Sequence, residues 1–203
     1  MFIREGLRSS PFMFRNLNMD LITQLAKFAR IETDRLILRP QKLEDVDDQF
    51  EYASRPENLT FVFPPVSSKT ELEWSIANHH MKNPLGKWAI ELKTGHKMIG
   101  TIDFVELKEN DMTAEIGYCL NMDYWGKGYA TEALQSLTQH SFQDFGLREV
   151  VLNADTENLA SIAVIEKAGY RFIKNYKAAN KYSGKIRQFA QYRLRKAEYY
   201  EQT

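Results

Sequence analysis

Two glycines and an alanine alternate in the middle of the chain, where a predicted strand passes into a predicted helix. The segment consists of Tyr124, Trp125, Gly126, Lys127, Gly128, Tyr129, Ala130 and Thr131. The first backbone N–H groups of a helix have no partners inside the helix, and the helix dipole favours negative charge beside them. Small side chains leave that backbone open and Lys127 adds a positive charge, so the segment predicts a site for a diphosphate group. An ordinary tight turn between strand and helix is the alternative interpretation.

Two other phosphate-binding patterns fit this segment less well. A P-loop requires Gly-x-x-x-x-Gly-Lys-Ser/Thr, which the sequence does not contain. A dinucleotide-binding turn requires a third glycine where Thr131 stands. It also requires an acidic residue at the end of the following strand, whereas Glu149 lies at the start of that strand. The spacing therefore indicates a different class of phosphate site.

Hydrophobic periodicity predicts the elements that position this segment. Helices are expected at residues 20–30, 44–54, 68–81, 126–145 and 158–168, and residues 55–68 are expected to form a loop. Strands are expected at residues 35–40, 88–92, 98–107, 113–120, 149–154, 170–176 and 186–194. Antiparallel strands come first and two helical crossovers follow, which predicts an α/β fold with a sheet of mixed direction.

Composition excludes several classes of protein. The 203 residues carry 27 basic and 27 acidic side chains, a formal net charge of zero, and one cysteine. This charge balance lacks the basic field that nucleic-acid binding needs, and one cysteine cannot form an internal disulfide. No stretch approaches the roughly 18 apolar residues of a membrane span. We therefore expect a cytoplasmic monomer or homodimer with no nucleic-acid or membrane partner, in which an extension at residues 1–30 precedes one domain at residues 31–203.

Four segments together resemble one known family. They are residues 33–39, residues 114–118, the glycine segment, and residues 158–170 with Asn158, Ser161 and the run from Glu166 to Tyr170. The family is the GCN5-related N-acetyltransferase (GNAT) superfamily, and the branch is the one that acetylates ribosomal-protein N-termini. Its motif is Gln/Arg-x-x-Gly-x-Gly/Ala; Gly128 and Ala130 match the last two positions, and Trp125 replaces the Gln/Arg. The resemblance spans about residues 31 to 195.

The resemblance implies a GNAT-type mixed β-sheet with splayed central parallel strands, flanked by helices, and acetyl-CoA as the cofactor. The strands at 113–120 and 149–154 would separate at their carboxyl ends, so that the pantetheine arm lies between them while the glycine segment binds the pyrophosphate. The residues implied to bind the cofactor are Cys119, Leu120, Asn121, Trp125, Gly126, Lys127, Gly128, Tyr129, Ala130, Thr131, Asn153 and Asn158.

Glu115 is the expected general base. An amine attacks a thioester only when neutral, which at pH 7 costs about 4.6 kcal/mol for a lysine-like amine but only about 1 kcal/mol for an α-amine. A carboxylate that acts through water therefore suffices for an N-terminal acceptor. Strand alternation places Glu115, Gly117 and Cys119 on one face, which would put Glu115 beside the acetyl group if that face looks into the cleft. A solvated or ion-paired carboxylate is the alternative.

The resemblance also implies that the Ser161 hydroxyl protonates the leaving thiolate; the alternative is that Ser161 only assists a cap by Asn158 or Thr156. Many family members use a tyrosine four residues further on, where this chain has Ile165. Cys119 is expected to be a buried thiol rather than a nucleophile, because no histidine is near it in sequence. The four histidines lack metal-ligand spacing, so no metal is expected.

These residues predict transfer of acetyl from acetyl-CoA to a primary amine by direct attack. The leading acceptor is a protein N-terminal α-amine of the ribosomal-protein type. Phe61, Phe63 and Trp74 are expected to line its site, although packing of this loop on the core is the alternative. A small-molecule amine, such as a polyamine or an aminoglycoside, and a non-catalytic acyl-CoA-binding module remain alternative functions. An acid-lined pocket would favour a polycation, and an open groove would favour a peptide end.

Overall fold

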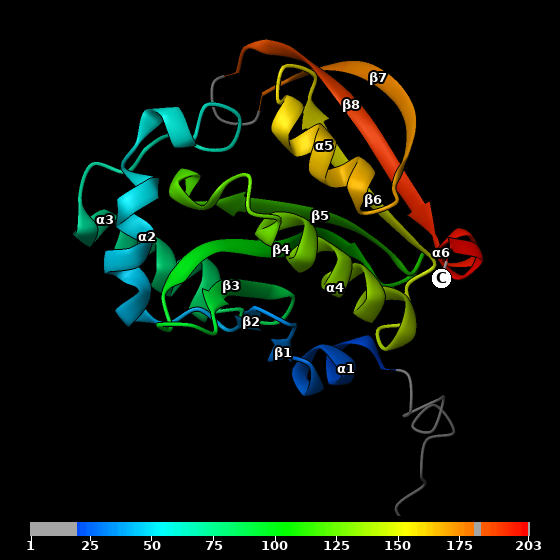
Figure 1. Ribbon diagram of the computed structural model, residues 1–203, viewed down its shortest axis with the longest axis horizontal. Coiled ribbons are helices and arrows are strands. Elements are labelled where there is room, and N and C mark those ends of the chain that lie inside the picture. The colour runs from blue at the N-terminus through cyan, green and yellow to red at the C-terminus, as the bar shows by residue number, and fades with distance from the viewer. Residues whose placement is uncertain (1–19, 181–183, 203) are drawn as a thin grey trace, which may run out of the picture.

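The computed structural model describes residues 20–180 and 184–202, so residues 1–19 of the expected extension at residues 1–30 lie outside the described part. The described residues form an eight-stranded sheet with helices packed on it (Figure 1). The strands are β1 (Ile31–Glu32), β2 (Leu36–Arg39), β3 (Lys87–Leu92), β4 (Met98–Lys108), β5 (Thr113–Leu120), β6 (Glu149–Asp155), β7 (Arg171–Ala179) and β8 (Ile186–Arg195). Their order in the sheet is β1-β2-β3-β4-β5-β6-β8-β7. Among these strands β5 and β6 are parallel and the other neighbours are antiparallel, which confirms the predicted mixed α/β sheet.

The helices lie close to the ranges that periodicity predicts. They are α1 (Leu21–Lys27), α2 (Val46–Ala53), α3 (Lys69–Ser75), α4 (Tyr129–Gln143), α5 (Leu159–Lys167) and α6 (Lys196–Gln202). The predicted helix at 68–81 changes to a π-helical turn at Ile76–Met81. The two-residue strand β1 and helix α6 were not expected, since two residues show no alternation and α6 follows β8 directly.

Alternating side chains of the sheet enter two separate hydrophobic clusters. On β5, Ile116 belongs to the larger cluster together with Leu134 and Leu137 of α4. Cys119 belongs to the smaller cluster with Tyr52 of α2. This confirms the predicted alternation, because residues three apart on a strand face opposite sides. Helix α1 packs into the larger cluster through buried leucines, and the boundary at residue 30 stays a prediction.

The long helix α4 begins three residues later than predicted. Gly126 and Gly128 have φ angles of +72° and +81°, in the left-handed region. A right-handed helix cannot contain such residues, so both glycines belong to a loop that leads into Tyr129, the first helical residue. The expected helix at 126–145 is therefore wrong at its start. The glycines form an open loop in front of the helix instead of its first turn.

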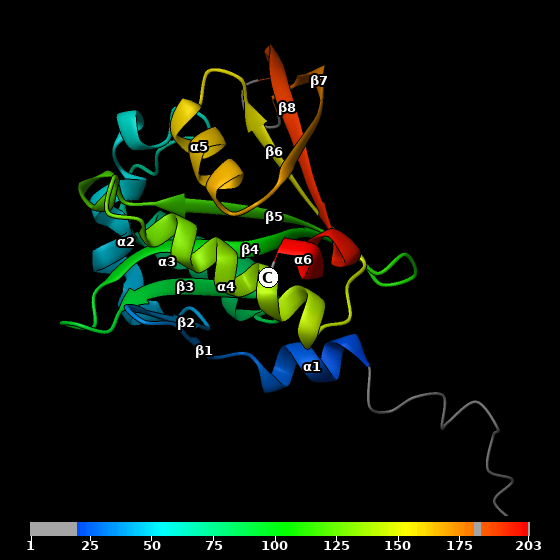
Figure 2. The ribbon, with the colours of Figure 1, turned by 45° about the vertical axis from the view of Figure 1, so that its right-hand side comes forward.

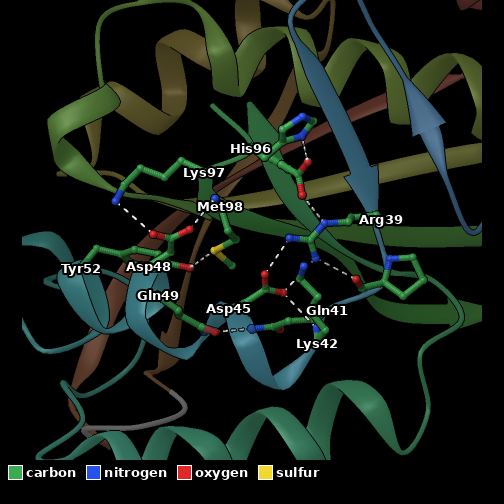
Figure 3. A network of polar contacts seen from close by, with 12 residues as sticks. Arg39, Gln41, Lys42, Asp45, Asp48, Gln49, Tyr52, His96, Lys97 and Met98 are labelled. Atoms are coloured by element: carbon green, nitrogen blue, oxygen red, sulfur yellow. Dashed lines mark hydrogen bonds and ion pairs between the residues drawn. The ribbon is translucent and has the colours of Figure 1, made fainter. Parts of the chain in front are cut away.

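A buried charge network ties the first strands to helix α2 (Figure 3). The guanidinium of Arg39 donates to both carboxylate oxygens of Asp45, at 2.9 and 2.6 Å, and also to Glu91 of β3. The two carboxylates are nearly buried, with 3% and 9% of their side chains exposed. The other oxygen of Glu91 accepts a hydrogen bond from Nδ1 of His96 at 2.9 Å. The network fixes the position at which the chain leaves the sheet for α2 and the loop beyond it.

We expect Arg39→Ala to lower the free energy of unfolding by about 3–5 kcal/mol, because it leaves two buried carboxylates without a counter-charge. Urea unfolding measures this change. Arg30→Ala, which removes an exposed partner of Glu32, is the matched control and should have little effect. The pKa of Glu91 is lowered because hydrogen bonds from Arg39 and His96 outweigh its burial. The loss in the free energy of unfolding should therefore be largest at pH values above the ordinary pKa of carboxyl groups, and it should shrink as the pH falls through that range. An equal loss at all pH values would contradict this account.

Candidate active site

Strands β5 and β6 pair only at their beginnings and then diverge. Their register covers Thr113 to Glu115 on β5 and Glu149 to Val151 on β6. Beyond these residues β6 continues beside β8, and β5 continues beside β4, so a gap opens between them toward their carboxyl ends (Figures 1 and 2). Alternate backbone groups of β5 face this gap, where an extended chain with amide groups can pair with them. The splayed parallel strands predicted for this sheet are thus present.

A cavity of about 570 Å³ lies at the open end of the gap. It is bounded by the end of β5, the loop before α4, the first turns of α4 and α5, and the segment from Glu57 to Val62. The predicted site residues that line it are Phe61, Cys119, Leu120, Trp125, Gly126, Gly128, Tyr129, Ala130, Thr131, Asn158 and Ser161. The fold therefore brings the glycine segment and the start of α5 to the same space, although they are about 30 residues apart.

The N-terminus of α4 opens into this cavity without a side-chain cap. Gly128 is the N-cap residue of this helix. Among the described residues, no side chain caps the N–H groups of the first turn. In contrast, Asn158 caps α5 by accepting from the N–H of Ser161 at 3.1 Å, and Ser68 caps α3 by accepting from the N–H of Glu71 at 3.2 Å. Uncapped N–H groups at the end of a 15-residue helix are available to an anion. Asn158 therefore serves as a helix cap, and its implied contact with the cofactor stays a prediction.

Two hydroxyl groups meet in the cavity. The Tyr118 hydroxyl of β5 lies 2.9 Å from the Oγ of Ser161 on α5, and it also donates to the Ser161 carbonyl at 3.2 Å. Burial raises the pKa of Tyr118 to about 12, although its hydrogen bond to Ser161 lowers it, so this phenol stays protonated at neutral pH. The contact joins β5 to α5 and places two hydroxyl groups side by side in the cavity lining. Sequence reasoning missed Tyr118, although alternation had placed it opposite Glu115.

Ile165 stands where many family members have a tyrosine, so this position provides no hydroxyl group. Ile165 of α5 is 1% exposed and belongs to the larger hydrophobic cluster. Tyr118 instead brings a phenol to the cavity from the neighbouring strand. The hydroxyl chemistry next to Ser161 therefore comes from a different element than the resemblance suggests.

Glu115 lies where the two strands begin to separate. Its pairing with Val151 is the last one between β5 and β6, and its side chain belongs to the face that carries Gly117 and Cys119. Burial raises the pKa of Tyr176 of β7, and the charge of Glu115 raises it further. Glu115 is thus near the narrow end of the gap and outside the lining of the 570 Å³ cavity. Its role as base stays a prediction.

Cys119 has the properties of a structural thiol. It is 7% exposed and packs in the smaller hydrophobic cluster. Burial raises the pKa of its thiol to about 12, which leaves almost no thiolate at neutral pH. The amide nitrogen of Asn58 is 3.8 Å from the sulfur. The sequence-based expectation of a buried thiol is confirmed, and covalent acyl transfer through this residue is disfavoured.

Several predicted site residues lie away from the cavity lining. Asn121 is fully buried and uses its side chain to cap the turn at Met122–Tyr124. The Lys127 ammonium turns back to the Asp123 carbonyl at 3.0 Å, and Asn153 accepts from Gln191 at 3.3 Å. Phe63 packs against the smaller cluster, and Trp74 is 60% exposed beside His79. The assigned binding roles of these residues stay predictions, and the structure does not bring the last two to the cavity.

The loop before α3 reaches the cavity through Phe61, which the sequence singled out, and through Asn58, which it did not. Asn58, which is 5% exposed, donates to the Leu120 carbonyl at 3.1 Å and accepts from the Met122 N–H at 2.6 Å. Phe61 lies under the guanidinium of Arg187 of β8, at 5.7 Å. These contacts join the loop to both sides of the gap. The sequence carries no signal for Asn58, because the burial of a loop asparagine cannot be read from sequence.

Comparisons with known proteins agree with this geometry. A family model described as "Acetyltransferase (GNAT) domain" matches residues 35–171. The chain belongs to the GNAT family of acetyltransferases. A protein called "Uncharacterized N-acetyltransferase p20" from Bacillus licheniformis is 29% identical over 174 residues, which cover 82% of this chain and 96% of that protein. A GNAT-family acetyltransferase structure from Bacillus anthracis has a TM-score of 0.75 at 23% identity and covers 83% of this chain and 99% of that one.

A shorter match concerns a GNAT protein with a named acceptor. The "Ribosomal-protein-serine acetyltransferase" of Escherichia coli K12 is 35% identical over 74 residues, which cover 36% of this chain and 41% of that protein. Together the family and its relatives show that this chain is an N-acetyltransferase that uses acetyl-CoA as the acetyl donor. Within the described part of the chain, no cluster of three or more histidine, cysteine or acidic side chains could hold a metal ion. None of the described helices is long and apolar enough to cross a membrane.

Proposed function

We propose that this GNAT enzyme acetylates the N-terminal α-amine of a protein, with acetyl-CoA bound along the gap between β5 and β6. One observation carries the proposed placement: the unpaired edges of the gap open directly onto the uncapped start of α4 within one cavity. Strand edges suit the amide-containing pantetheine arm, and the helix start suits the pyrophosphate. The two binding surfaces are adjacent, as a single extended ligand requires.

The glycine loop is suited to the pyrophosphate. Gly126 and Gly128 both adopt left-handed φ angles, and a Cβ at Gly126 would meet open space. Side chains are therefore missing on the side from which an anion reaches the N–H groups of Gly128, Tyr129 and Ala130. The helix dipole adds partial positive charge at the same place. These residues would hold the phosphates mainly through backbone N–H groups rather than through Lys127.

We expect Gly128→Glu to weaken acetyl-CoA binding by at least about a hundredfold, because the new carboxylate would lie at the anion site and the left-handed φ is strained for glutamate. Isothermal titration calorimetry measures the affinity. Gly95→Glu is a matched control: Gly95 has φ +79° and open space around it in the turn between β3 and β4, away from the cavity lining. Retained affinity in Gly128→Glu would contradict the placement of the pyrophosphate.

The mouth of the cavity favours a peptide end over a polycation. Among the described lining residues the carboxylates are Glu57 and Glu157, and Lys167 adds a positive charge. Arg187 pairs with Glu157 at 3.0 Å and with Asp155 at 2.6 Å, so acidic charge at this end is largely neutralised. The partial match to the ribosomal-protein-serine acetyltransferase supports the same acceptor class. An α-amine also needs less help from a base than a lysine-like amine.

The acceptor class can be tested with thiol release from acetyl-CoA in the presence of different amines. We expect peptides with a free α-amine to exceed the same peptides with a blocked α-amine and one lysine by about 400-fold in kcat/KM at pH 7, as the difference in amine pKa implies. Spermidine and an aminoglycoside complete the panel. Preference for either small amine, or for the lysine side chain, would contradict a protein N-terminus as the acceptor.

Within this proposal two side chains manage the protons of the transfer. Acetyl-CoA supplies an activated thioester when bound. As the N–C bond forms and the C–S bond breaks, Glu115 takes the proton that the amine releases, through a water molecule. The Ser161 hydroxyl gives its proton to the departing sulfur and recovers one from solvent, while the hydrogen bond to Tyr118 holds it in position. Glu115 belongs to β5 and Ser161 to α5, so the proposed base and acid come from different elements.

We expect Glu115→Gln to reduce kcat by about a hundredfold and to shift the pH–rate profile toward alkaline pH, because the amine must then lose its proton to solvent. Affinity for acetyl-CoA should stay close to wild type. Glu106→Gln is a matched control, since Glu106 faces Glu115 directly across the β4–β5 ladder and pairs with Lys108 in an exposed position. An unchanged profile for Glu115→Gln would exclude Glu115 as the base.

A further inference from the structure

Arg35 packs against the glycine loop, although it lies 91 residues before Gly126 in the chain. Its Nη1 donates to the carbonyl of Lys127 at 2.9 Å, and its Nε donates to Glu132 of α4 at 2.6 Å. Its guanidinium also lies 4.5 Å from the centre of the Tyr129 ring. The remaining nitrogen, Nη2, is 3.3 Å from the point where a Cβ on Gly128 would stand. One guanidinium thus contacts the loop, its last glycine and the first turn of the helix.

The hydrogen bond to Lys127 orients the peptide that carries the Gly128 N–H. A trans peptide is planar, and its C=O and N–H point in opposite directions. Because Arg35 draws the Lys127 carbonyl toward β2, the N–H of Gly128 must point away from Arg35. Gly128 lines the cavity, so this geometry directs its N–H to the side where a ligand can approach. Glycine accepts many backbone conformations, so Gly128 by itself does not select this orientation of the peptide.

Arg35 also compensates a negative charge next to the anion site. Glu132 lies in the first turn of α4, and only 17% of its side chain is exposed. Burial raises its pKa, but hydrogen bonds from the Thr33 hydroxyl and from the N–H and guanidinium of Arg35 lower it overall. Glu132 therefore stays ionised close to the helix start. Without Arg35, an uncompensated carboxylate would oppose a phosphate bound there.

We infer that Arg35 is a positioning residue for phosphate recognition: it holds the 126–128 loop in its anion-binding conformation and neutralises Glu132. The contacts of Arg35 with the Lys127 carbonyl, Glu132 and Tyr129 carry this inference. It rests on the proposed function in one respect, that the phosphates of acetyl-CoA bind at this loop. Arg35 acts through the loop backbone, so its effect should appear only with donors that carry phosphates.

The experiment compares acetyl-CoA with S-acetylpantetheine, which has the same thioester and arm but no phosphates. We expect Arg35→Ala to raise the KM for acetyl-CoA by about tenfold or more, as for other hydrogen bonds made by charged groups, and to change kcat/KM for S-acetylpantetheine by less than about twofold. Arg30→Ala is the matched control, because it removes an arginine of similar exposure whose partner, Glu32, is outside the cavity lining. Thermal unfolding of each variant verifies that it is folded.

Arg35→Lys separates positioning from direct contact with a phosphate. A lysine keeps the charge but cannot reach Lys127 and Glu132 together as a planar guanidinium does. We therefore expect it to lose most of the affinity for acetyl-CoA, whereas a direct phosphate contact would be largely retained. Amide hydrogen exchange of residues 125–131 without any donor provides an independent measurement. It should be faster in Arg35→Ala and Arg35→Lys than in wild type and in Arg30→Ala.

The outcomes distinguish this inference from the proposed function. If the wild-type enzyme does not prefer acetyl-CoA over S-acetylpantetheine, the proposed phosphate site is wrong. In that case, amide hydrogen exchange of residues 125–131 alone decides whether Arg35 orders the loop. If wild type has the preference and Arg35→Ala keeps it, the inference is overturned. Equal losses with both donors would also overturn it, since they would indicate a general effect on the fold. A loss restricted to acetyl-CoA together with faster exchange of the loop supports it.

Discussion

The early end of the β5–β6 ladder is the constraint on which the rest of this structure depends. Two parallel neighbours that paired along their full lengths would leave no space between them. Here the ladder stops at Glu115 and Val151, and each strand then follows a different antiparallel partner. Buried backbone N–H and C=O groups need partners, so edges exposed inside the molecule favour water or a ligand with amides of its own. The binding gap thus follows from sheet pairing before any side chain is considered.

The helices that flank the gap differ in how their first turns are satisfied. Asn158 closes the start of α5 with its own side chain, and this cap also holds Ser161 next to Tyr118. The start of α4 has no such cap, and the left-handed glycines before it keep the approach open. An anion can therefore bind at α4, whereas α5 contributes hydroxyl groups. The same local element, a helix N-terminus, acquires two different roles through one capping residue.

Charged side chains maintain this arrangement from outside the gap. Arg39 joins β2 and β3 to the start of α2, and so fixes the loop that brings Asn58 and Phe61 to the cavity. Arg187 joins the far end of β6 to that loop through Asp155 and the Phe61 ring. Each guanidinium connects elements that no continuous secondary structure links. Planar donors with several N–H groups suit this function, because one residue can satisfy two or three acceptors at fixed angles.

Local properties of the chain were readable from sequence. Periodicity located nearly every helix and strand, and alternation separated the two faces of β5. The glycine segment, together with three other segments, indicated the family. These features depend on residues that are neighbours in sequence, so a pattern records them directly. The same is true of the thiol of Cys119, which lies on an apolar strand with no histidine near it.

Contacts between distant segments were decided only by the tertiary structure. Three contacts in the site join residues 43 to 92 positions apart in the chain. They are the Tyr118–Ser161 hydroxyl pair, the hydrogen bond of Arg35 to the Lys127 carbonyl, and the hydrogen bond of the buried Asn58 to the Leu120 carbonyl. The start of α4 was misplaced because φ angles of glycine are set by the loop's surroundings and glycine itself accepts either sign. Trp74 and Phe63 were expected at the acceptor site because aromatic type is visible in sequence, whereas the direction in which a side chain points is not. Sequence patterns determine the elements and their chemistry, and packing decides which of those groups share one space.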